Sequence, residues 1–369
     1  MQSTKHSLGR FLAVVAAVSV VCSAATTEAA RPGMAPGQIK IESIGPMAFA
    51  ESGILLVGDP KAATVYAIEL DATDSGNSQV EVADVQAAIA KAANTTSDKV
   101  KLGDLAADST RQIVILSAEV DGAVGLFRIL PDGSAQTIDT AKILHAKKVI
   151  PNAPADEETG EGRRRRNRRL ESITDLAFFD GKVLVSGLTQ EDSDSSVREF
   201  PFPFAENTHV TNVEIFHAAH GRVESPTIQT FVPINIAGEP SLLAGFTCTP
   251  LVRFPIDQLN GGDKVRGTTI AELGNRNRPL DLIVYMKDNA SHLLMSNSAR
   301  GVMKISTENL NAAPGLTEPV GGGGTAGQPF ETVEAFQDVL QMDKLDATHA
   351  VLLVGKPEST QKLVTVVLP

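Results

Sequence analysis

The sequence has few of the residues that cross-link small exported proteins or stack on sugars. It contains no tryptophan, its aromatic content is only 4%, and its two cysteines are Cys22 and Cys248. Cys22 lies in a predicted leader, so Cys248 would have no partner for an intramolecular disulfide. No C-x-x-C pair and no C-x-x-C-H occur, which excludes a zinc knuckle, a thioredoxin-like site and covalent c-type haem. So few aromatic rings argue against a platform on which carbohydrate could stack.

Several well-known catalytic signatures are also missing. There is no G-x-S-x-G elbow, no P-loop, no G-x-G-x-x-G after a strand and no H-E-x-x-H. The sequence therefore leaves open whether the protein is an enzyme. Its net charge of −11 argues against binding to nucleic acid or to anionic lipid.

The first 30 residues are typical of a signal peptide. Lys5 and Arg10 precede an apolar run at 11–21, which is too short to span a bilayer as a helix, and small residues follow. An alternative is lipidation at Cys22. No later run reaches 18 apolar residues, so we expect no transmembrane segment. We expect a periplasmic or secreted protein, monomeric, with residues 31–369 as one domain and an unknown protein or small molecule as its partner.

Six segments of the sequence share one pattern. Each has a short apolar strand opened by Asp or Pro, then a strand rich in Leu and Val that ends near Gly or Ser, then a third strand; the segments begin at residues 46, 104, 175, 233, 281 and 338. The spacing fits propeller blades of about 40–50 residues with insertions. The pattern predicts an all-β, six-bladed β-propeller, and the alternative is an open β-sandwich. Fourth strands are expected at 212–218 and 268–273.

The ends of the chain suggest how the ring closes. The last repeat supplies three strands, and a spare strand, IKIESI, lies at 39–44 before the first repeat. Because a propeller leaves no unpaired edge, we expect this N-terminal strand to close the last blade by pairing 39–44 with 362–368.

The recurring pattern of an aspartate before apolar strands, Φ-x-D-Φ-Φ…Φ-Φ-Φ-x-G, carries a resemblance. Along most of the mature chain the sequence resembles exported bacterial propellers of the NHL and gluconolactonase-like groups. The stretch at 274–306, GNRNRPLDLIVY…LLMSNSARGVMKIS, is similar to exported bacterial propellers without an assigned activity. The absence of tryptophan separates it from WD40 propellers. Because propellers include enzymes and pure binding modules, the resemblance implies the fold and not the activity.

Three segments interrupt the strand pattern. Residues 81–93 have apolar residues at helical spacing and predict one short inserted helix, ended by Asn94. Residues 151–169 join an acidic block to an arginine-rich block and predict a mobile loop, which could bind an anionic partner or simply be solvated. Residues 320–328, VGGGGTAGQ, predict a second flexible loop.

A set of aspartates opens the innermost strands of four predicted blades. Because these strands line the central channel, four carboxylates could converge near one mouth and bind a hard cation such as Ca²⁺. The alternative is that each carboxylate accepts hydrogen bonds from nearby backbone amides. Two blades have Pro46 and Pro233 instead, so the ring would be incomplete. These candidate metal ligands are Asp104, Asp175, Asp281 and Asp338.

Two further groups are candidate ligand-binding residues. In NVEIFHAAHG, His217 and His220 could act with Glu214 on a transition metal or in proton transfer if residues 218–221 form a turn; otherwise they are surface or packing residues. Arg276 and Arg278 precede a channel strand and could hold a carboxylate or phosphate, or form an ion pair between blades. Cys248 could be reactive beside them or could be a small buried residue.

Three functions remain open from the sequence. The first is a non-catalytic binding or scaffold protein. The second is a metal-assisted hydrolase or lactonase with its site at the aspartate-bearing mouth. The third is an accessory protein of a periplasmic redox system, for which the chain has no cofactor motif of its own.

Overall fold

A computed structural model describes residues 33–369, except 52, 72–75, 77–78, 163–164 and 191–194. Residues Gly33–Pro369 form one compact unit. The predicted leader, with Cys22, lies outside the described residues. Among the described residues, no helix is long and apolar enough to cross a membrane.

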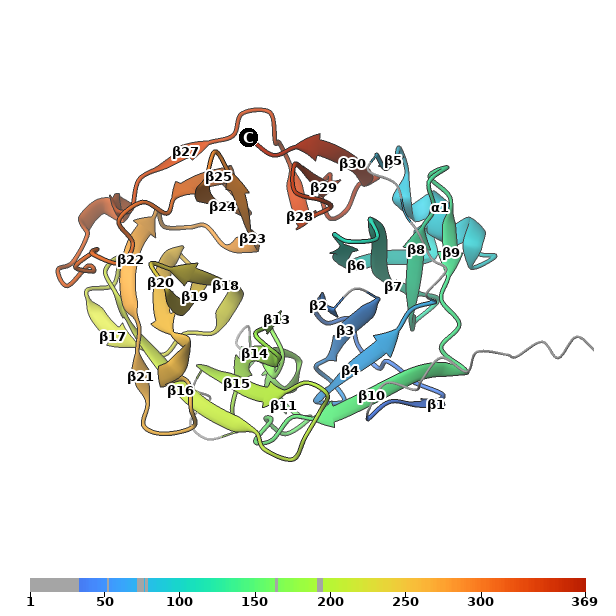
Figure 1. Cartoon of the computed structure of the whole chain (residues 1–369), viewed down its shortest axis with the longest axis horizontal. Coiled ribbons are helices and arrows are strands. Elements are labelled where there is room, and N and C mark those ends of the chain that lie inside the picture. Colours follow the sequence, from blue (N-terminus) through green and yellow to red (C-terminus); the bar gives the residue numbers. More distant parts are fainter. Residues whose placement is uncertain (1–32, 52, 72–75, 77–78, 163–164, 191–194) are drawn as a thin grey trace, which may run out of the picture. The chain divides into compact units, whose positions relative to one another are not determined.

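Six small antiparallel sheets surround a central axis, which confirms the six-bladed β-propeller (Figure 1). We number the blades 1–6 by the order of their innermost strands along the chain. These strands are β2 (Met47–Glu51), β6 (Val100–Asp108), β13 (Asp175–Phe179), β18 (Ile228–Ile236), β23 (Pro279–Lys287) and β28 (Val339–Lys344).

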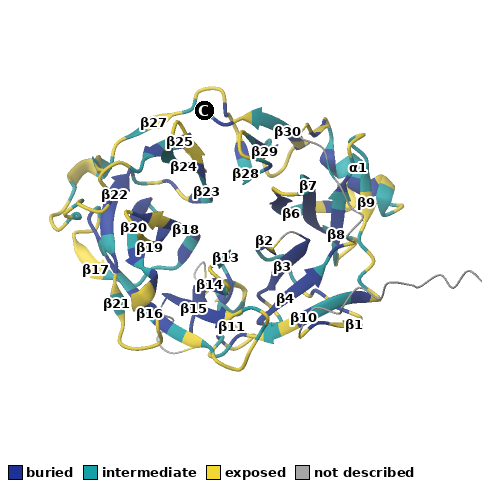
Figure 2. Cartoon of the chain, viewed as in Figure 1, coloured by how far each residue is buried: buried dark blue, intermediate teal, exposed yellow. Residues whose placement is uncertain are grey.

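The middle strands of each blade form the core. The second strands are β3 (Ile54–Asp59), β7 (Ile113–Val120), β14 (Lys182–Leu188), β19 (Glu239–Phe246), β24 (Ala290–Asn297) and β29 (His349–Val354). The third strands are β4 (Thr64–Glu69), β8 (Ala123–Ile129), β15 (Ser195–Pro201), β20 (Pro250–Pro255), β25 (Gly301–Ser306) and β30 (Lys362–Val367). Every residue of β3 is buried, because both faces of its sheet pack against neighbouring blades (Figure 2).

The blades do not follow one another around the ring in chain order. The innermost strand of blade 1, β2, lies between β6 of blade 2 and β13 of blade 3, and β28 of blade 6 lies beside β6 (Figure 1). The order around the ring is therefore 1, 3, 4, 5, 6, 2. After blade 1 the chain moves to one side to form blade 2, then passes blade 1 again to form blade 3.

Each time the chain passes from one blade to another in this region, it forms an outer strand on a third blade or on a blade it has already built. On its way from blade 1 to blade 2, the chain forms β5 (Glu81–Val82), which pairs with β30 of blade 6. On its way from blade 2 to blade 3, it forms β10 (Ile143–Val149), which pairs with β4 of blade 1, and β1 (Ala35–Gly37) pairs with β10. The other outer strands are β9 (Ala135–Thr137), β16 (His209–His217), β22 (Thr268–Leu273) and β27 (Phe330–Thr332).

An early strand does complete the last blade, but the predicted closing strand was wrong. Residues 39–44 are not a strand, and Leu363 and Val364 pair with Val82 and Glu81 instead. The buried carboxylate of Asp59 accepts hydrogen bonds from the backbone N–H groups of Glu42 at 2.6 Å and Ser43 at 3.2 Å. These bonds hold 39–44 against blade 1, away from blade 6.

The predicted helix is confirmed as α1 (Val85–Ala92), the one α-helix among the described residues. It begins later than expected because 81–82 form β5 and the carboxylate of Asp84 caps the helix by accepting from Ala87 N–H at 2.8 Å. The helix packs against blade 2, where Val85 and Ile89 are fully buried.

Both predicted loops contain regular structure. Within 151–169, β11 (Glu158–Thr159) and β12 (Arg166–Asn167) form a small hairpin. Within 320–328, β26 (Thr325–Gly327) pairs with β22 and adds a fifth strand to blade 4, so the glycine-rich segment is not a loop throughout. Two short strands complete the set, β17 (Arg222–Glu224) and β21 (Val265–Arg266), and both pair with β16.

Candidate functional site

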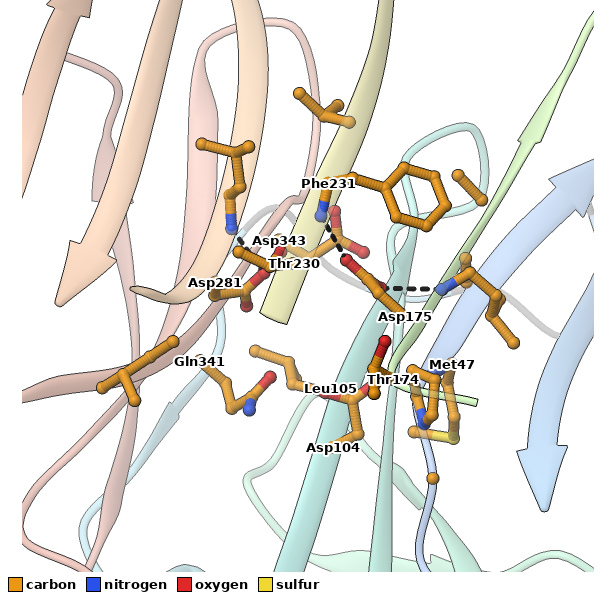
Figure 3. Close-up of a pocket in the computed structure, with 18 of the residues that line it drawn as sticks. Met47, Asp104, Leu105, Thr174, Asp175, Thr230, Phe231, Asp281, Gln341 and Asp343 are labelled. Atoms are coloured by element: carbon orange, nitrogen blue, oxygen red, sulfur yellow. Dashed lines mark hydrogen bonds between the residues drawn. The ribbon is translucent and has the colours of Figure 1, made fainter. Parts of the chain in front are cut away.

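The innermost strands of all six blades line a cavity of about 570 Å³ on the axis of the ring. Its charged lining residues are four aspartates and one lysine: Asp104, Asp175, Asp281, Asp343 and Lys344. Side chains of Thr174, Thr230, Gln229 and Gln341 add polar groups. Figure 3 shows the aspartates and Gln341 around one shared space. With every carboxyl group ionised, the lining would carry a net charge of −3, from four negative groups and one positive group.

Each aspartate is bound to the backbone of its own strand. The Oδ1 atom of Asp175 accepts from Leu176 N–H at 2.8 Å, and Oδ1 of Asp281 accepts from Leu282 N–H at 2.7 Å. Asp343 and Asp104 bind the N–H groups of Lys344 and Leu105 in the same way. These local bonds fix the orientation of each carboxyl group toward the axis.

The second oxygen of each aspartate binds a neighbouring blade. Oδ2 of Asp175 accepts from Phe231 N–H of blade 4 at 2.6 Å, and Oδ2 of Asp281 accepts from Met342 N–H of blade 6 at 2.7 Å. The two remaining bonds run from Ala107 N–H to Asp343 at 2.7 Å and from Met47 N–H to Asp104 at 2.5 Å. The aspartates therefore join four of the six pairs of adjacent blades. Blades 1 and 4, which carry Pro46 and Pro233, supply none.

Gln341 connects two of the carboxylates. With its amide nitrogen turned toward the channel, it donates to Asp104 Oδ1 at 2.5 Å and to Asp281 Oδ2 at 3.3 Å. Asp104 and Asp281 thus lie on either side of one amide group. Because both are acidic, each makes ionisation of the other less favourable.

The pKa values of all four aspartates are raised. Desolvation by the surrounding protein raises the pKa of Asp104 to about 8 and the pKa values of Asp175 and Asp343 to about 6. Burial and the negative charge of Asp104 raise the pKa of Asp281 well above its ordinary value. The backbone hydrogen bonds act in the opposite direction, and they are weaker than the cost of burial.

Three of the four predicted channel aspartates reach the cavity, and Asp338 does not. Asp338 is exposed, has a φ of 52°, and lies in the turn before β28. Its place is taken by Asp343, which lies two residues after Gln341 and therefore faces the same side of β28. Strand alternation from Gln341 could have identified Asp343. The match of Asp338-Val339-Leu340 to the repeat was misleading because β28 has a bulge between Val339 and Gln341.

The four aspartates do not form a compact metal cage. Within the described residues, no three of them bring one oxygen each to within 4.8 Å of one another. A bare Ca²⁺ ion binds its ligand oxygens at about 2.3–2.6 Å, so neighbouring ligands would have to lie closer together than these carboxylates do.

The two histidines do converge, at a different place. Residues 218–220 form a turn after β16, so His220 folds back over His217, with ring centroids 3.8 Å apart. Their carboxylate partner is Glu224 and not Glu214, which pairs with Arg266 at 2.7 Å. This histidine cluster is separate from the residues that line the axial cavity.

The remaining candidates lie elsewhere. Arg276 and Arg278 are exposed, and neither lines the axial cavity. Between them, buried Asn277 accepts from Cys248 N–H at 2.8 Å and donates to Asn297 at 3.0 Å, so it anchors this loop. Cys248 is half-buried in the turn between β19 and β20 with a φ of 67°.

Comparisons with known proteins give no family. No protein-family model and no curated protein matches the chain. Among solved structures, a chain of the mitotic checkpoint complex is 7% identical with a TM-score of 0.35, covering 91% of this chain and 94% of that chain. A 6-phosphogluconolactonase-like protein from Bacteroides uniformis is 11% identical with a TM-score of 0.34, covering 88% and 78%. The resemblance inferred from the repeat is therefore one of fold alone.

Proposed function

We propose that the protein is a non-catalytic binding protein whose axial cavity takes a small organic cation, such as a di- or polyamine. The observation that carries the proposal is the excess of carboxyl groups in one axial cavity: Asp104, Asp175, Asp281 and Asp343 face only Lys344 as a cationic lining residue. Burial makes these carboxyl groups hard to ionise without a cationic partner, and an ammonium group would supply one.

The hydrogen bonds support binding more than catalysis. Both oxygens of Asp175 and Asp281 accept backbone N–H bonds, yet a carboxylate oxygen retains a second lone pair that can face a ligand. A cavity of about 570 Å³ lies within the size range of small-molecule sites. Fixed acceptors in a preformed cavity lose little conformational entropy when they bind.

A hydrolase is the second candidate, and one observation favours it. Burial keeps Asp104, with a pKa of about 8, largely protonated at neutral pH, as a general acid must be. In this alternative, Asp104 would donate a proton to a leaving group while an ionised aspartate such as Asp175 acts as base.

Calorimetric titration of the full chain with spermidine, putrescine and CaCl₂ tests the proposal. We expect one amine to bind per chain, with protons released at pH 7, because a cation lowers the pKa values of Asp104 and Asp281. Proton release is read from the dependence of the binding enthalpy on the buffer. Asp281→Asn should weaken amine binding at least about tenfold, since a charge-assisted contact is worth about 1.5–3 kcal/mol.

Asp338→Asn is the matched control, because Asp338 opens the same strand pattern but lies outside the cavity. Its amine affinity should equal that of the unmodified chain. Absence of amine binding by folded protein would reject the proposal. Lactone hydrolysis that is lost in Asp104→Asn and retained in Asp338→Asn would favour the hydrolase instead.

A further inference from the structure

A second polar cluster lies at the outer edge of blade 3, where β16 and β17 form a hairpin. The turn after β16 is closed by hydrogen bonds from His220 N–H at 3.0 Å and Gly221 N–H at 2.8 Å, both to the carbonyl of His217. Gly221 has a φ of 64°, which favours glycine. His217 pairs with Arg222, so His217 and Glu224 lie on one face of the hairpin.

Both imidazoles direct the same atom at the same carboxylate oxygen. His220 Nδ1 lies 2.9 Å from Glu224 Oε1, and His217 Nδ1 forms a short hydrogen bond to that oxygen. The other carboxylate oxygen of Glu224 accepts from Arg222 Nε at 3.0 Å, which fixes its rotation. Ligand atoms of His217, His220 and Glu224 all lie within 4.8 Å of one another.

Two buried atoms near this cluster lack partners. Among the described residues, His217 Nε2 and Glu272 Oε2 have no hydrogen bond, although His217 is only 2% exposed and Glu272 only 1%. Glu272 comes from β22 of blade 4, and its Oε1 accepts from Ala219 N–H in the turn at 3.1 Å. It lies close enough to His220 and Glu224 for their charges to act on it. Because His217 faces Glu224 through Nδ1, its Nε2 lies on the far side of the ring, so Glu272 Oε2 is the orphaned atom that could take a partner at the cluster.

The nitrogen and oxygen atoms gathered in this cluster are ligands typical of a transition-metal ion. Two imidazole nitrogens with one or two carboxylates suit Zn²⁺ and its neighbours, whereas Ca²⁺ prefers oxygen ligands only. Zinc bonds of about 2.0–2.2 Å keep ligand atoms within roughly twice that distance of one another, so small side-chain rotations would admit the ion.

We propose that His217, His220 and Glu224, with Glu272 as a fourth ligand, bind one divalent transition-metal ion of the zinc class and thereby join blade 3 to blade 4. His220 is 41% exposed, so the ion can enter from the surface. The site is independent of the axial cavity and of any ligand there.

The test is titration of ZnCl₂ into untagged, EDTA-treated and dialysed full chain, with bound metal measured by elemental analysis. We expect one equivalent of zinc and a higher Tm, since a ligand that binds only the folded state stabilises it. Co²⁺ in place of zinc should give the visible absorption of a site with nitrogen ligands.

Two variants and a control distinguish the site from adventitious binding. His220→Ala and Glu224→Gln should each weaken zinc binding at least about tenfold, and His220 is exposed enough for its variant to fold. His209→Ala should leave the affinity unchanged, because His209 lies on the same strand but contacts Glu199 at 3.6 Å instead.

Two results would overturn the assignment. The first is less than about a tenth of an equivalent of zinc on folded protein. The second is binding that His220→Ala and Glu224→Gln do not affect. An unchanged affinity in Glu272→Gln would remove Glu272 from the ligand set.

Discussion

Arg198 on β15 is the largest fully buried side chain among the described residues. Its guanidinium group donates to three backbone carbonyls: Nε to Pro151 at 3.1 Å, Nη1 to Ser172 at 3.2 Å and Nη2 to Leu188 at 2.9 Å. Burial lowers its pKa to about 10, so it stays charged at neutral pH. One side chain thus holds together the insert before blade 3, the segment that enters β13 and the end of β14.

We expect replacement of Arg198 to destabilise the folded protein. We expect Arg198→Met to lower the free energy of unfolding by about 3–5 kcal/mol, because three carbonyls lose a charged donor and each bond to a charged group is worth about 1.5–3 kcal/mol before relaxation. Urea denaturation measures the change. Arg266→Met is the control, since Arg266 forms an exposed pair with Glu214 and should cost less than about 1 kcal/mol. Equal effects of the two variants would contradict this role.

At the scale of elements, the short strand β5 has a larger role than its length suggests. Its two residues complete blade 6, which would otherwise expose the edge of β30. The sequence at 81–82 carries no strand signal, because it merges with the helical pattern of 81–93. The apolar alternation at 39–44 is a stronger strand signal than the sequence at 81–82. In the structure, however, this segment forms no strand, and Ile39 and Ile41 are buried in the core between blades 1 and 2.

Engineered disulfides can distinguish the two closures. In a Cys248→Ser background, the pair Glu81→Cys and Val364→Cys should oxidise readily, because these positions are opposite each other in β5 and β30. The pair Ile41→Cys and Val364→Cys should not. Mass spectrometry of the oxidised protein measures both. Efficient cross-linking of residues 41 and 364 would instead support the closure predicted from the sequence, in which 39–44 pairs with 362–368.

The sequence predicted the fold well and the site in part, for physical reasons. Each blade buries its middle strands, so apolar runs such as 54–58 and 350–354 identify the blades. Which blades become neighbours depends on contacts between distant strands, such as β2 with β13, and no local pattern records them. Asp104, Asp175 and Asp281 were found because they recur in the repeat, whereas Glu224 and Glu272 converge only through the turn and an adjacent blade.

The stability of the whole molecule should depend on the channel carboxyl groups. A carboxyl group whose pKa is higher in the folded state than its unfolded value of about 3.9 favours the folded state most when it is protonated. Between that value and its folded pKa, the folded state binds more protons, so stability falls as the pH rises. For Asp175 and Asp343 this window ends at about pH 6, and for Asp104 at about pH 8.

We therefore expect the Tm of the ligand-free protein to fall between about pH 5 and pH 8. Asp104→Asn should make the fall above about pH 6 smaller, because Asp175 and Asp343 are more than half ionised there and only Asp281, whose pKa is also raised, still contributes strongly. Asp338→Asn should leave the profile unchanged. Thermal unfolding in buffers of equal ionic strength measures all three. A Tm that rises steadily up to pH 8 would show that ionisation of these carboxyl groups does not destabilise the folded state, and would contradict this prediction.

The order of blades around the ring also has a mechanical consequence. Because β5 lies on blade 6 and continues through α1 into β6, the covalent chain crosses the junction between blades 6 and 2. The segment from β10 to β13 crosses the junction between blades 1 and 3 in the same way. Neither junction is thus held by side-chain contacts alone. Under tension, separating blade 6 from blade 2 therefore requires that β5 be peeled from β30 or that the segment to β6 be stretched, and separating blade 1 from blade 3 makes the same demand on β10.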